Sequence, residues 1–275
     1  MLLATAWPAA AQLVIGGPAP YPTPPKLEAD EKKEAPPPPP TFSGDPIAVP
    51  VDCDAGRLHT VGLFCVAATP CEIFAEWTAA AHAGEALIVA GGFYASAAPV
   101  ESVVLRSEDG GATWMEAAER ILGAALDEMT FVDANHGWIV GRQSVGGGWR
   151  PFLLATADGG ASWARRTIDS DEDNSGMVAE LRFDSPEHGY AILERPAGAD
   201  DPYELYESYN GGRSWSIRQI AAERPAIPGS RRRPAEPGAR VGESSGGAAV
   251  VEVREGGGWR VAARFSERAG VCGPE

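Results

Sequence analysis

The stretch SEDGGATW at residues 107–114 decides the fold class, because nearly the same eight residues occur twice more. TADGGASW occupies residues 156–163 and SYNGGRSW occupies residues 208–215. A second motif precedes each of the last two copies, as FVDANHGWIVG at 131–141 and FDSPEHGYAILE at 183–194. Two signatures that return in a fixed order indicate a chain built from repeated structural units.

Each octapeptide has the composition of a turn between two strands. Asp109 can accept hydrogen bonds from backbone N–H groups, Gly111 supplies a backbone angle that other residues resist, and Trp114 begins the next strand with a large apolar side chain. In the third copy Asn210 keeps the acceptor and loses only the charge. We therefore predict structural roles for Ser107, Asp109, Gly111, Thr113, Trp114, Thr156, Asp158, Gly160, Ser162, Trp163, Ser208, Asn210, Gly212, Ser214 and Trp215.

Between the turns, apolar and polar residues alternate over a few positions and stop at Gly, Asn or Asp, which is typical of strands in hairpins. We predict four strands in each unit. A fourth unit follows, because GGGWRVAARFSERAG at 256–270 aligns without a gap with GGGWRPFLLATADGG at 146–160, although Arg268 replaces the acid. The span 55–275 holds four such units, and a fifth only if the others shrink.

These residues resemble the Asp-box, or BNR repeat, of sialidase-type β-propellers. The pairing with HGW and HGY is more similar to the photosystem II assembly and stability factors and to exported bacterial BNR-repeat proteins. The resemblance covers residues 72–219 well and 247–270 weakly. It implies an all-β propeller of four, or at most five, four-stranded blades, in which the Asp-boxes are structural and lie away from the ligand face.

A propeller has to pair its last blade with its first or leave sheet edges open. Residues 57–68, RLHTVGLFCVAA, have strand character and belong to no unit, so we predict that this N-terminal strand completes the last blade. This closure would bring Cys53 and Cys272 together as a disulfide that clamps the ring, and Cys65 and Cys71 would close a small loop. The other pairings stay open, as does a metal site, although the spacings match no zinc pattern.

The ends and the composition define the surroundings of this domain. Residues 1–16 resemble the end of a secretory signal with a small-residue cleavage site, although no Lys or Arg precedes the apolar part. Residues 17–46 are dominated by Pro and charge and predict a disordered tether, so the propeller would occupy 47–275. We therefore expect an exported protein, periplasmic or extracellular, whose even number of cysteines fits an oxidising compartment.

Charge and hydropathy exclude two classes of partner. The chain has 23 Lys and Arg against 38 Asp and Glu, a net charge of −15, whereas binding nucleic acid requires a basic face. A membrane-spanning helix requires about 18 apolar residues in a row, and no such run occurs.

Two loops attract attention as binding sites. In DSDEDNSGMVAE at 169–180, four acidic residues fall at positions one, three, five and twelve of a calcium-loop pattern, with Asn174 where Gly is usual. These residues, Asp169, Asp171, Asp173 and Glu180, fit either a calcium site or a solvated acidic loop. The basic loop 230–240 offers Arg231, Arg232 and Arg233 to a partner protein, or is simply solvated.

No catalytic constellation stands out. The sequence offers no convincing Ser/His/Asp set and no phosphate-binding loop, and of the three arginines that a sialidase needs only Arg182 can be placed on an innermost strand. The sequence therefore predicts a non-catalytic exported propeller without a cofactor other than calcium, which binds a protein partner as a scaffold or assembly factor, or a surface glycan. The alternative is a sialidase-like glycoside hydrolase.

Overall fold

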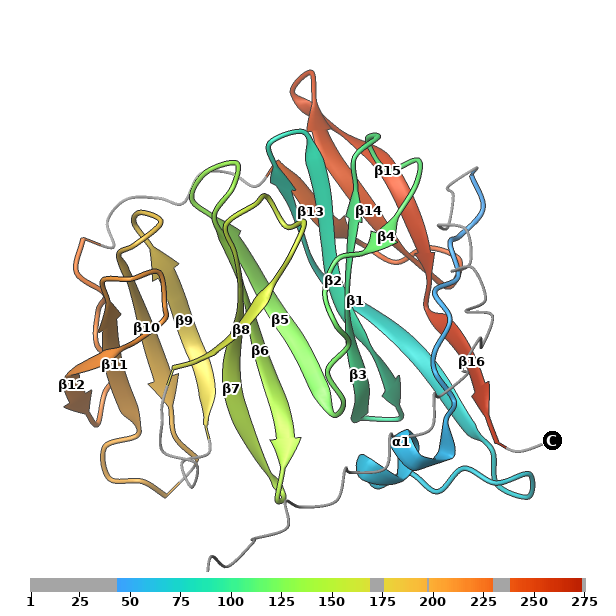
Figure 1. Ribbon diagram of the computed structural model, residues 1–275, viewed down its shortest axis with the longest axis horizontal. Coiled ribbons are helices and arrows are strands. Elements are labelled where there is room, and N and C mark those ends of the chain that lie inside the picture. The colour runs from blue at the N-terminus through green and yellow to red at the C-terminus, as the bar shows by residue number, and fades with distance from the viewer. Residues whose placement is uncertain (1–43, 169–175, 197, 230–237, 274–275) are drawn as a thin grey trace, which may run out of the picture. The chain divides into compact units, whose positions relative to one another are not determined.

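The computed structural model describes residues 44–168, 176–196, 198–229 and 238–273, which lie within one compact unit. Almost all of their regular structure is β, as alternating sequences between glycine-rich turns require. Figure 1 shows these strands as a series of twisted sheets, each made mainly of consecutive segments. The all-β prediction is confirmed, while the signal-like segment 1–16 and most of the tether 17–46 lie outside the described residues and stay predictions.

The first blade is an antiparallel sheet with the strand order β16-β1-β2-β3-β4. Its last strand in the chain, β16, comes from the C-terminal end and pairs Cys272 with Cys71 of β1. The bounds are β1 (Cys71–Ala83), β2 (Ala86–Ala95), β3 (Ala98–Ser107), β4 (Met115–Glu116) and β16 (Arg268–Cys272).

The second and third blades have four antiparallel strands each, and in both the Asp-box occupies the turn between the third and fourth strands. The second blade comprises β5 (Ala124–Phe131), β6 (Gly137–Val145), β7 (Gly148–Thr156) and β8 (Ala164–Thr167). The third comprises β9 (Met177–Phe183), β10 (Gly189–Glu194), β11 (Tyr203–Ser208) and β12 (Ser216–Ala221).

The fourth blade has three described strands, β13 (Ala239–Gly242), β14 (Ala248–Glu255) and β15 (Gly258–Ser266). The next segment, β16, leaves this sheet to join the first blade. The gapless alignment of 256–270 with 146–160 therefore locates the third strand correctly, and the degenerate fourth motif ends the blade.

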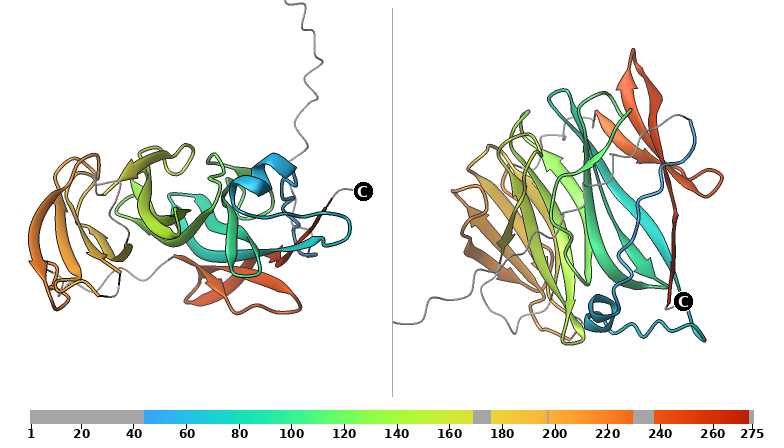
Figure 2. Two further views of the ribbon diagram at one scale, coloured as in Figure 1. Left: turned by 90° about the horizontal axis from the view of Figure 1, so that it is seen from below. Right: turned by 45° about the vertical axis from the view of Figure 1, so that its right-hand side comes forward.

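The blades lie side by side in Figures 1 and 2, and apolar clusters join neighbouring blades. Phe265 of the fourth blade lies among residues of the first, Phe152 of the second blade lies with Ile88 of the first, and Phe183 of the third lies with Trp138 of the second. The packing order is therefore fourth, first, second and third blade. Sheets stacked through such clusters are the blades of a β-propeller.

The HGW motif makes one of these contacts. The Trp138 ring stacks on Phe183 of the next blade at 3.5 Å between centroids, and its Nε1 donates to the Gly211 carbonyl at 3.0 Å. Gly137 is required because a Cβ there would lie 2.5 Å from the Phe131 ring. The recurring glycine and aromatic residue thus pack the hairpin and the next blade together.

The prediction that residues 57–68 form the closing strand was wrong. Residues Ala55–Thr60 form helix α1, because the Asp54 side chain accepts a hydrogen bond from the Arg57 N–H at 2.8 Å and caps the first turn. The segment 47–53, here called the strap, contacts the last blade instead. Ile47 forms a parallel bridge with Phe265 of β15, and Val51 lies beside Gly270 of β16.

Candidate partner-binding surface

The polar groups of the first Asp-box form hydrogen bonds within their own turn. The Asp109 carboxylate accepts from the Thr113 N–H at 2.8 Å and from the Thr113 hydroxyl at 2.6 Å. Ser107 Oγ donates to Asp109 at 2.8 Å and accepts from the Gly111 N–H at 2.9 Å, while Trp114 Nε1 donates to the Gly111 carbonyl at 2.8 Å. These bonds tie both arms of the hairpin together, as the composition predicts.

The other two copies repeat this geometry. In the second, Asp158 accepts from the Ser162 N–H at 2.9 Å, and Thr156 Oγ1 accepts from the Gly160 N–H at 2.9 Å. In the third, Asn210 accepts from the Ser214 N–H at 2.9 Å and donates through its amide to the Ser214 hydroxyl at 2.8 Å. The amide therefore replaces the carboxylate without breaking the turn.

Gly111 shows why the motif needs glycine. Its φ of 101° lies in the left-handed region, and a Cβ there would come 2.7 Å from the Ala262 carbonyl of the fourth blade. Trp114 is fully buried against Phe265, at 5.2 Å between ring centroids. These residues are occupied with the turn and with the adjacent blade, so a binding surface has to be sought elsewhere.

Low pH is expected to weaken the first Asp-box turn. Hydrogen bonds from the hydroxyl and N–H of Thr113 lower the pKa of Asp109 to about 2. Because the folded pKa lies below the unfolded value near 4, the stabilisation is complete above about pH 4 and is lost as the pH falls through 2. We expect Asp109→Asn to cost less than about 1 kcal/mol at pH 7, since the carboxylate is exposed to solvent.

Urea unfolding of the wild-type protein and Asp109→Asn at pH 7 and pH 2.5 measures this effect. The two unfolding midpoints should approach each other at the lower pH. A difference that stays constant between the two pH values would show that ionisation of Asp109 does not stabilise the turn.

The structure brings the cysteines together in the pairs expected from the sequence. The Cα atoms of Cys53 and Cys272 are 5.2 Å apart, and those of Cys65 and Cys71 are 5.3 Å apart, with both pairs bonded as disulfides. The first disulfide joins the strap to β16, and the second closes a loop before β1. Both ends of the domain are therefore fixed at one corner.

The two loops predicted as binding sites lie only partly within the described residues. Arg231, Arg232 and Arg233 lie outside the described residues, as do Asp169, Asp171 and Asp173. Glu180 is described, on β9, and its carboxylate pairs with Arg224 at 2.8 Å. Within the described ranges no group of three His, Cys, Asp or Glu side chains could hold a metal ion, and the calcium loop stays a prediction.

Arg182 was the arginine expected on an innermost strand. It lies on β9, where its guanidinium forms two bonds to the Asp184 carboxylate, at 3.0 and 2.9 Å. An arginine already paired in this way does not present a free fork to a substrate carboxylate.

One group of apolar side chains stands out by its exposure. Phe64, Val66, Phe74 and Val271, here called the disulfide corner, have exposed fractions between 44% and 69%. Each of the four lies close in sequence to a cysteine of one of the two disulfides. Large apolar side chains that stay exposed beside rigid crosslinks indicate a contact site.

The loop of the disulfide corner is held from inside. Phe64 and Val66 flank Cys65, Val66 and Thr69 exchange backbone hydrogen bonds of 3.3 and 2.9 Å, and the His59 ring of α1 lies 4.8 Å from the Phe64 ring. A hollow of about 290 Å³ opens beside them between the two disulfides. The loop therefore presents its apolar side chains from a fixed backbone.

The outward direction of the strand residues in the disulfide corner follows from the alternation of side chains along a β-strand. On β1, Ile73 and Ala75 point into the core, so Glu72 and Phe74 point outward. Val271 of β16 lies directly opposite Glu72 and is exposed on the same side. Phe74 pairs with Arg268 of β16 across a bulge, and it is exposed on the same side of the sheet as Glu72.

A buried ion-pair cluster anchors this corner to the first blade. Glu101 of β3 is only 1% exposed, and its two carboxylate oxygens bind Arg57 of α1 at 2.9 Å and Arg120 at 2.6 Å. Arg120 also donates to the Pro50 carbonyl of the strap at 2.9 Å. Removing Glu101 would leave two arginines without their shared partner, so the cluster fixes α1 and the strap in place.

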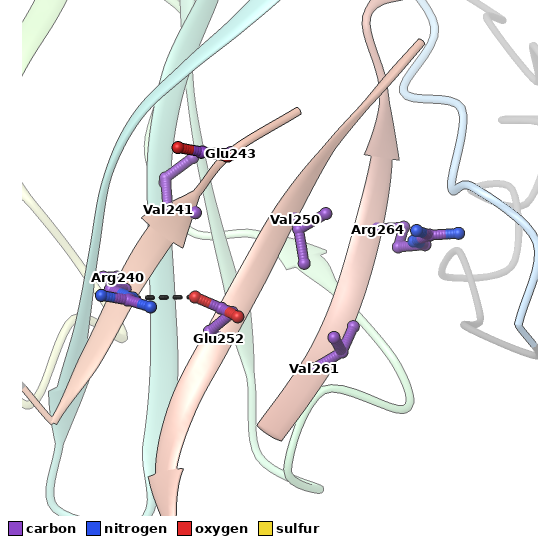
Figure 3. A pocket seen from close by; sticks show the side chains of 8 residues that line it. Arg240, Val241, Glu243, Val250, Glu252, Val261 and Arg264 are labelled. Atoms are coloured by element: carbon purple, nitrogen blue, oxygen red, sulfur yellow. Dashed lines mark hydrogen bonds and ion pairs between the residues drawn. The ribbon is translucent and has the colours of Figure 1, made fainter. Parts of the chain in front are cut away.

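A larger hollow of about 710 Å³ lies over the outer face of the fourth blade (Figure 3). Figure 3 shows Arg240 directed at Glu252, 2.8 Å away, with Val250 and Val261 on the neighbouring strands. The Arg240 guanidinium also stacks on the Trp259 ring at 4.1 Å. This face is wide, and its Arg240 is already paired with Glu252, which makes it a weaker site than the disulfide corner.

The disulfide corner has the chemistry of a contact site. Its side chains are apolar, and the ring of the adjacent His59 lies against Phe64 at a tilt of 36°. It can bury an apolar segment of another molecule. Sequence reasoning identified the cysteines but not the exposed phenylalanines, because alternation in CEIFAEW does not say which face is covered.

Comparisons with known proteins relate part of the chain to one family. Residues 112–197 match the family model described as photosynthesis system II assembly factor YCF48. No curated protein matches the chain. Within the described residues, the structure contains no helix with the length and hydropathy to cross a membrane.

Several solved structures are similar to the chain. YCF48 bound to D1 peptide has 20% identity and a TM-score of 0.38, with 72% of this chain and 57% of that chain covered. An ulvan lyase of polysaccharide lyase family PL25 has 11% identity, a TM-score of 0.42 and coverage of 72% and 53%. YCF48 from Cyanidioschyzon merolae has 16% identity, a TM-score of 0.33 and coverage of 72% and 58%. The chain thus spans a little over half the length of each.

Proposed function

We propose that this chain, an Asp-box β-propeller similar to the YCF48-like assembly factors, is a non-catalytic scaffold that binds a protein partner through the disulfide corner. The observation that carries the proposal is the exposure of Phe64, Val66, Phe74 and Val271 on a backbone fixed by two disulfides. A preorganised apolar surface binds with little loss of conformational entropy. The match of residues 112–197 to an assembly-factor family supports a protein as the partner.

The size of the surface suits a contact with a partner segment. Burying four half-exposed side chains stabilises a complex by roughly 1 kcal/mol each, at about 25 cal/mol per Å² of apolar area. The aromatic pair Phe64 and Phe74 should contribute most, since binding energy concentrates in large rigid side chains.

We also propose that the protein is exported. Both cysteine pairs are bonded, and disulfides persist in oxidising compartments. Localisation of the tagged native protein by cell fractionation tests this, and recovery from the cytosol with alkylatable cysteines would contradict it.

Substitution of the two phenylalanines tests the proposed function. We expect Phe64→Ser/Phe74→Ser to reduce capture of the partner from extracts of the producing cells by tenfold or more, which corresponds to about 1.4 kcal/mol. The matched control is Ile217→Ser/Ile220→Ser, which changes two apolar residues of similar exposure on β12.

Quantitative mass spectrometry of the captured proteins gives the readout, with far-UV circular dichroism to confirm folding. A protein that is lost with the Phe64/Phe74 variant and retained with the Ile217/Ile220 variant identifies the partner. Equal capture by both variants would place the binding surface elsewhere.

A further inference from the structure

A cluster of polar and aromatic side chains lies on the third blade, on the face turned away from the second. Along β10 and β11, Ala191, Leu193 and Tyr206 pack toward the second blade. Residues alternate between faces, so Glu207 lies on the other face, with Leu205 and Tyr190.

Glu207 is at the centre of this cluster and only 8% exposed. Its carboxylate accepts hydrogen bonds from His188 Nε2 at 2.9 Å, from the Tyr209 hydroxyl at 2.7 Å and from Arg218 Nε. Burial opposes ionisation, but these donors outweigh it and hold the pKa of Glu207 at about 2. The acid is therefore ionised and holds three neighbouring side chains in position.

The repeat shows that the fold does not require this cluster. At the positions of Glu207 and Tyr209 the second blade has Ala155 and Ala157, and its Asp-box turn forms the same hydrogen bonds. The histidine of the second blade, His136, bonds Asp133 of its own turn at 3.0 Å instead. Residues that depart from a repeat without a structural need point to a local function.

Tyr209 gives the cluster an open aromatic surface. The residue is 62% exposed, and its ring stacks on His188 with centroids 4.8 Å apart and planes tilted by 12°. The half-exposed Arg218 guanidinium lies over the ring, 5.9 Å from its centroid. Most of the Tyr209 side chain thus stays open to solvent, bordered by hydrogen-bonding groups.

We infer that this cluster is a binding site for a neutral β-linked pyranose oligosaccharide. Such a sugar carries equatorial hydroxyls, so its C–H face can lie on the Tyr209 ring while its hydroxyls bond to Arg218 and other polar groups at the rim. The charges are paired, Arg218 with Glu207 and Arg182 with Asp184, which favours an uncharged ligand over an anionic one. The site is separate from the disulfide corner.

Titration of the wild-type protein and three variants with cellotetraose tests the inference. NMR or calorimetry monitors the binding. We expect millimolar binding to the wild type and about tenfold weaker binding to Tyr209→Ala, since the aromatic contact is lost. Tyr209→Phe keeps the ring and should retain most of the affinity, although it gives up the bond to Glu207. Ile217→Ala, an exposed apolar residue on β12, should bind like the wild type.

Three results would overturn the inference. These are no binding of cellotetraose to the wild type, undiminished binding to Tyr209→Ala, or tighter binding of tetragalacturonate, which would make the ligand anionic. Because the Phe64/Phe74 variant leaves this site intact, it should bind cellotetraose normally. A failure here is thus distinguishable from a failure of the proposed protein-binding function.

Discussion

Replacing Cys53 and Cys272 by serine is expected to lower the free energy of unfolding by about 4 kcal/mol, because the disulfide removes entropy from a very long loop in the unfolded chain. The two cysteines are 219 residues apart. In the folded protein the same bond holds the strap against β16, beside the single β-bridge between Ile47 and Phe265. Its loss should therefore also release the strap before the blades unfold.

The Cys65→Ser/Cys71→Ser variant is the matched control, since its loop spans only 6 residues. The entropy of closing so short a loop is smaller, and the expected cost is about 2 kcal/mol. Guanidinium unfolding of both variants under non-reducing conditions gives the comparison. An equal or larger loss in the Cys65/Cys71 variant would show that the long crosslink does not hold the domain together.

Trp138→Ala is expected to cost about 3–5 kcal/mol, the range for deletion of a buried aromatic side chain. The ring is 2% exposed, stacks on Phe183 of the next blade and donates to the Gly211 carbonyl at 3.0 Å. The substitution leaves a cavity between two blades and removes the hydrogen bond that links the HGW motif of one blade to the Asp-box of the next.

Trp149→Ala provides the control for this second prediction. Trp149 is only partly buried at the β6–β7 hairpin, where Arg142 lies 5.1 Å from its ring, and its removal should cost about 1 kcal/mol. Thermal unfolding followed by near-UV circular dichroism measures both. Similar midpoints for the two variants would mean that Trp138 does not bridge the blades.

The repeated turns could be predicted because their information is local. Asp109, Gly111 and Thr113 are within five residues of one another, and the bonds that define the turn join them directly. The fourth unit was recognisable for the same reason, from a gapless alignment of one strand and its turns. The Cys53–Cys272 pair was predicted from a ring that must join its two ends, although residues 57–68 do not form the closing strand, and the Cys65–Cys71 pair was predicted as the closure of a small loop.

Features that depend on contacts between residues far apart in the chain could not be predicted from local sequence. Helix α1 occupies a segment with strand-like alternation, and its stability depends on the Asp54 cap and on Glu101, 44 residues from its partner Arg57. The strap was assigned to the start of the domain without a role, because nothing in Ile47 alone indicates a bridge to Phe265.

The exposure of these side chains could not be predicted from the sequence either. Phe74 and Ile73 are both apolar, and only the packing of the first blade decides that Ile73 is buried and Phe74 faces solvent. Glu207 and its donors come from two different strands and two turns, so their convergence requires the register of β11 with both β10 and β12.

Site-specific photocrosslinking tests the central claim most directly. A benzophenone amino acid is introduced at position 64 of the disulfide corner or, in a separate protein, at the comparably exposed position 217 of β12. After irradiation with extracts of the producing cells, a covalent adduct with one defined protein is predicted from position 64 and not from position 217. The same adducts from both positions, or none from position 64 while the wild-type protein still captures its partner, would contradict binding through the disulfide corner.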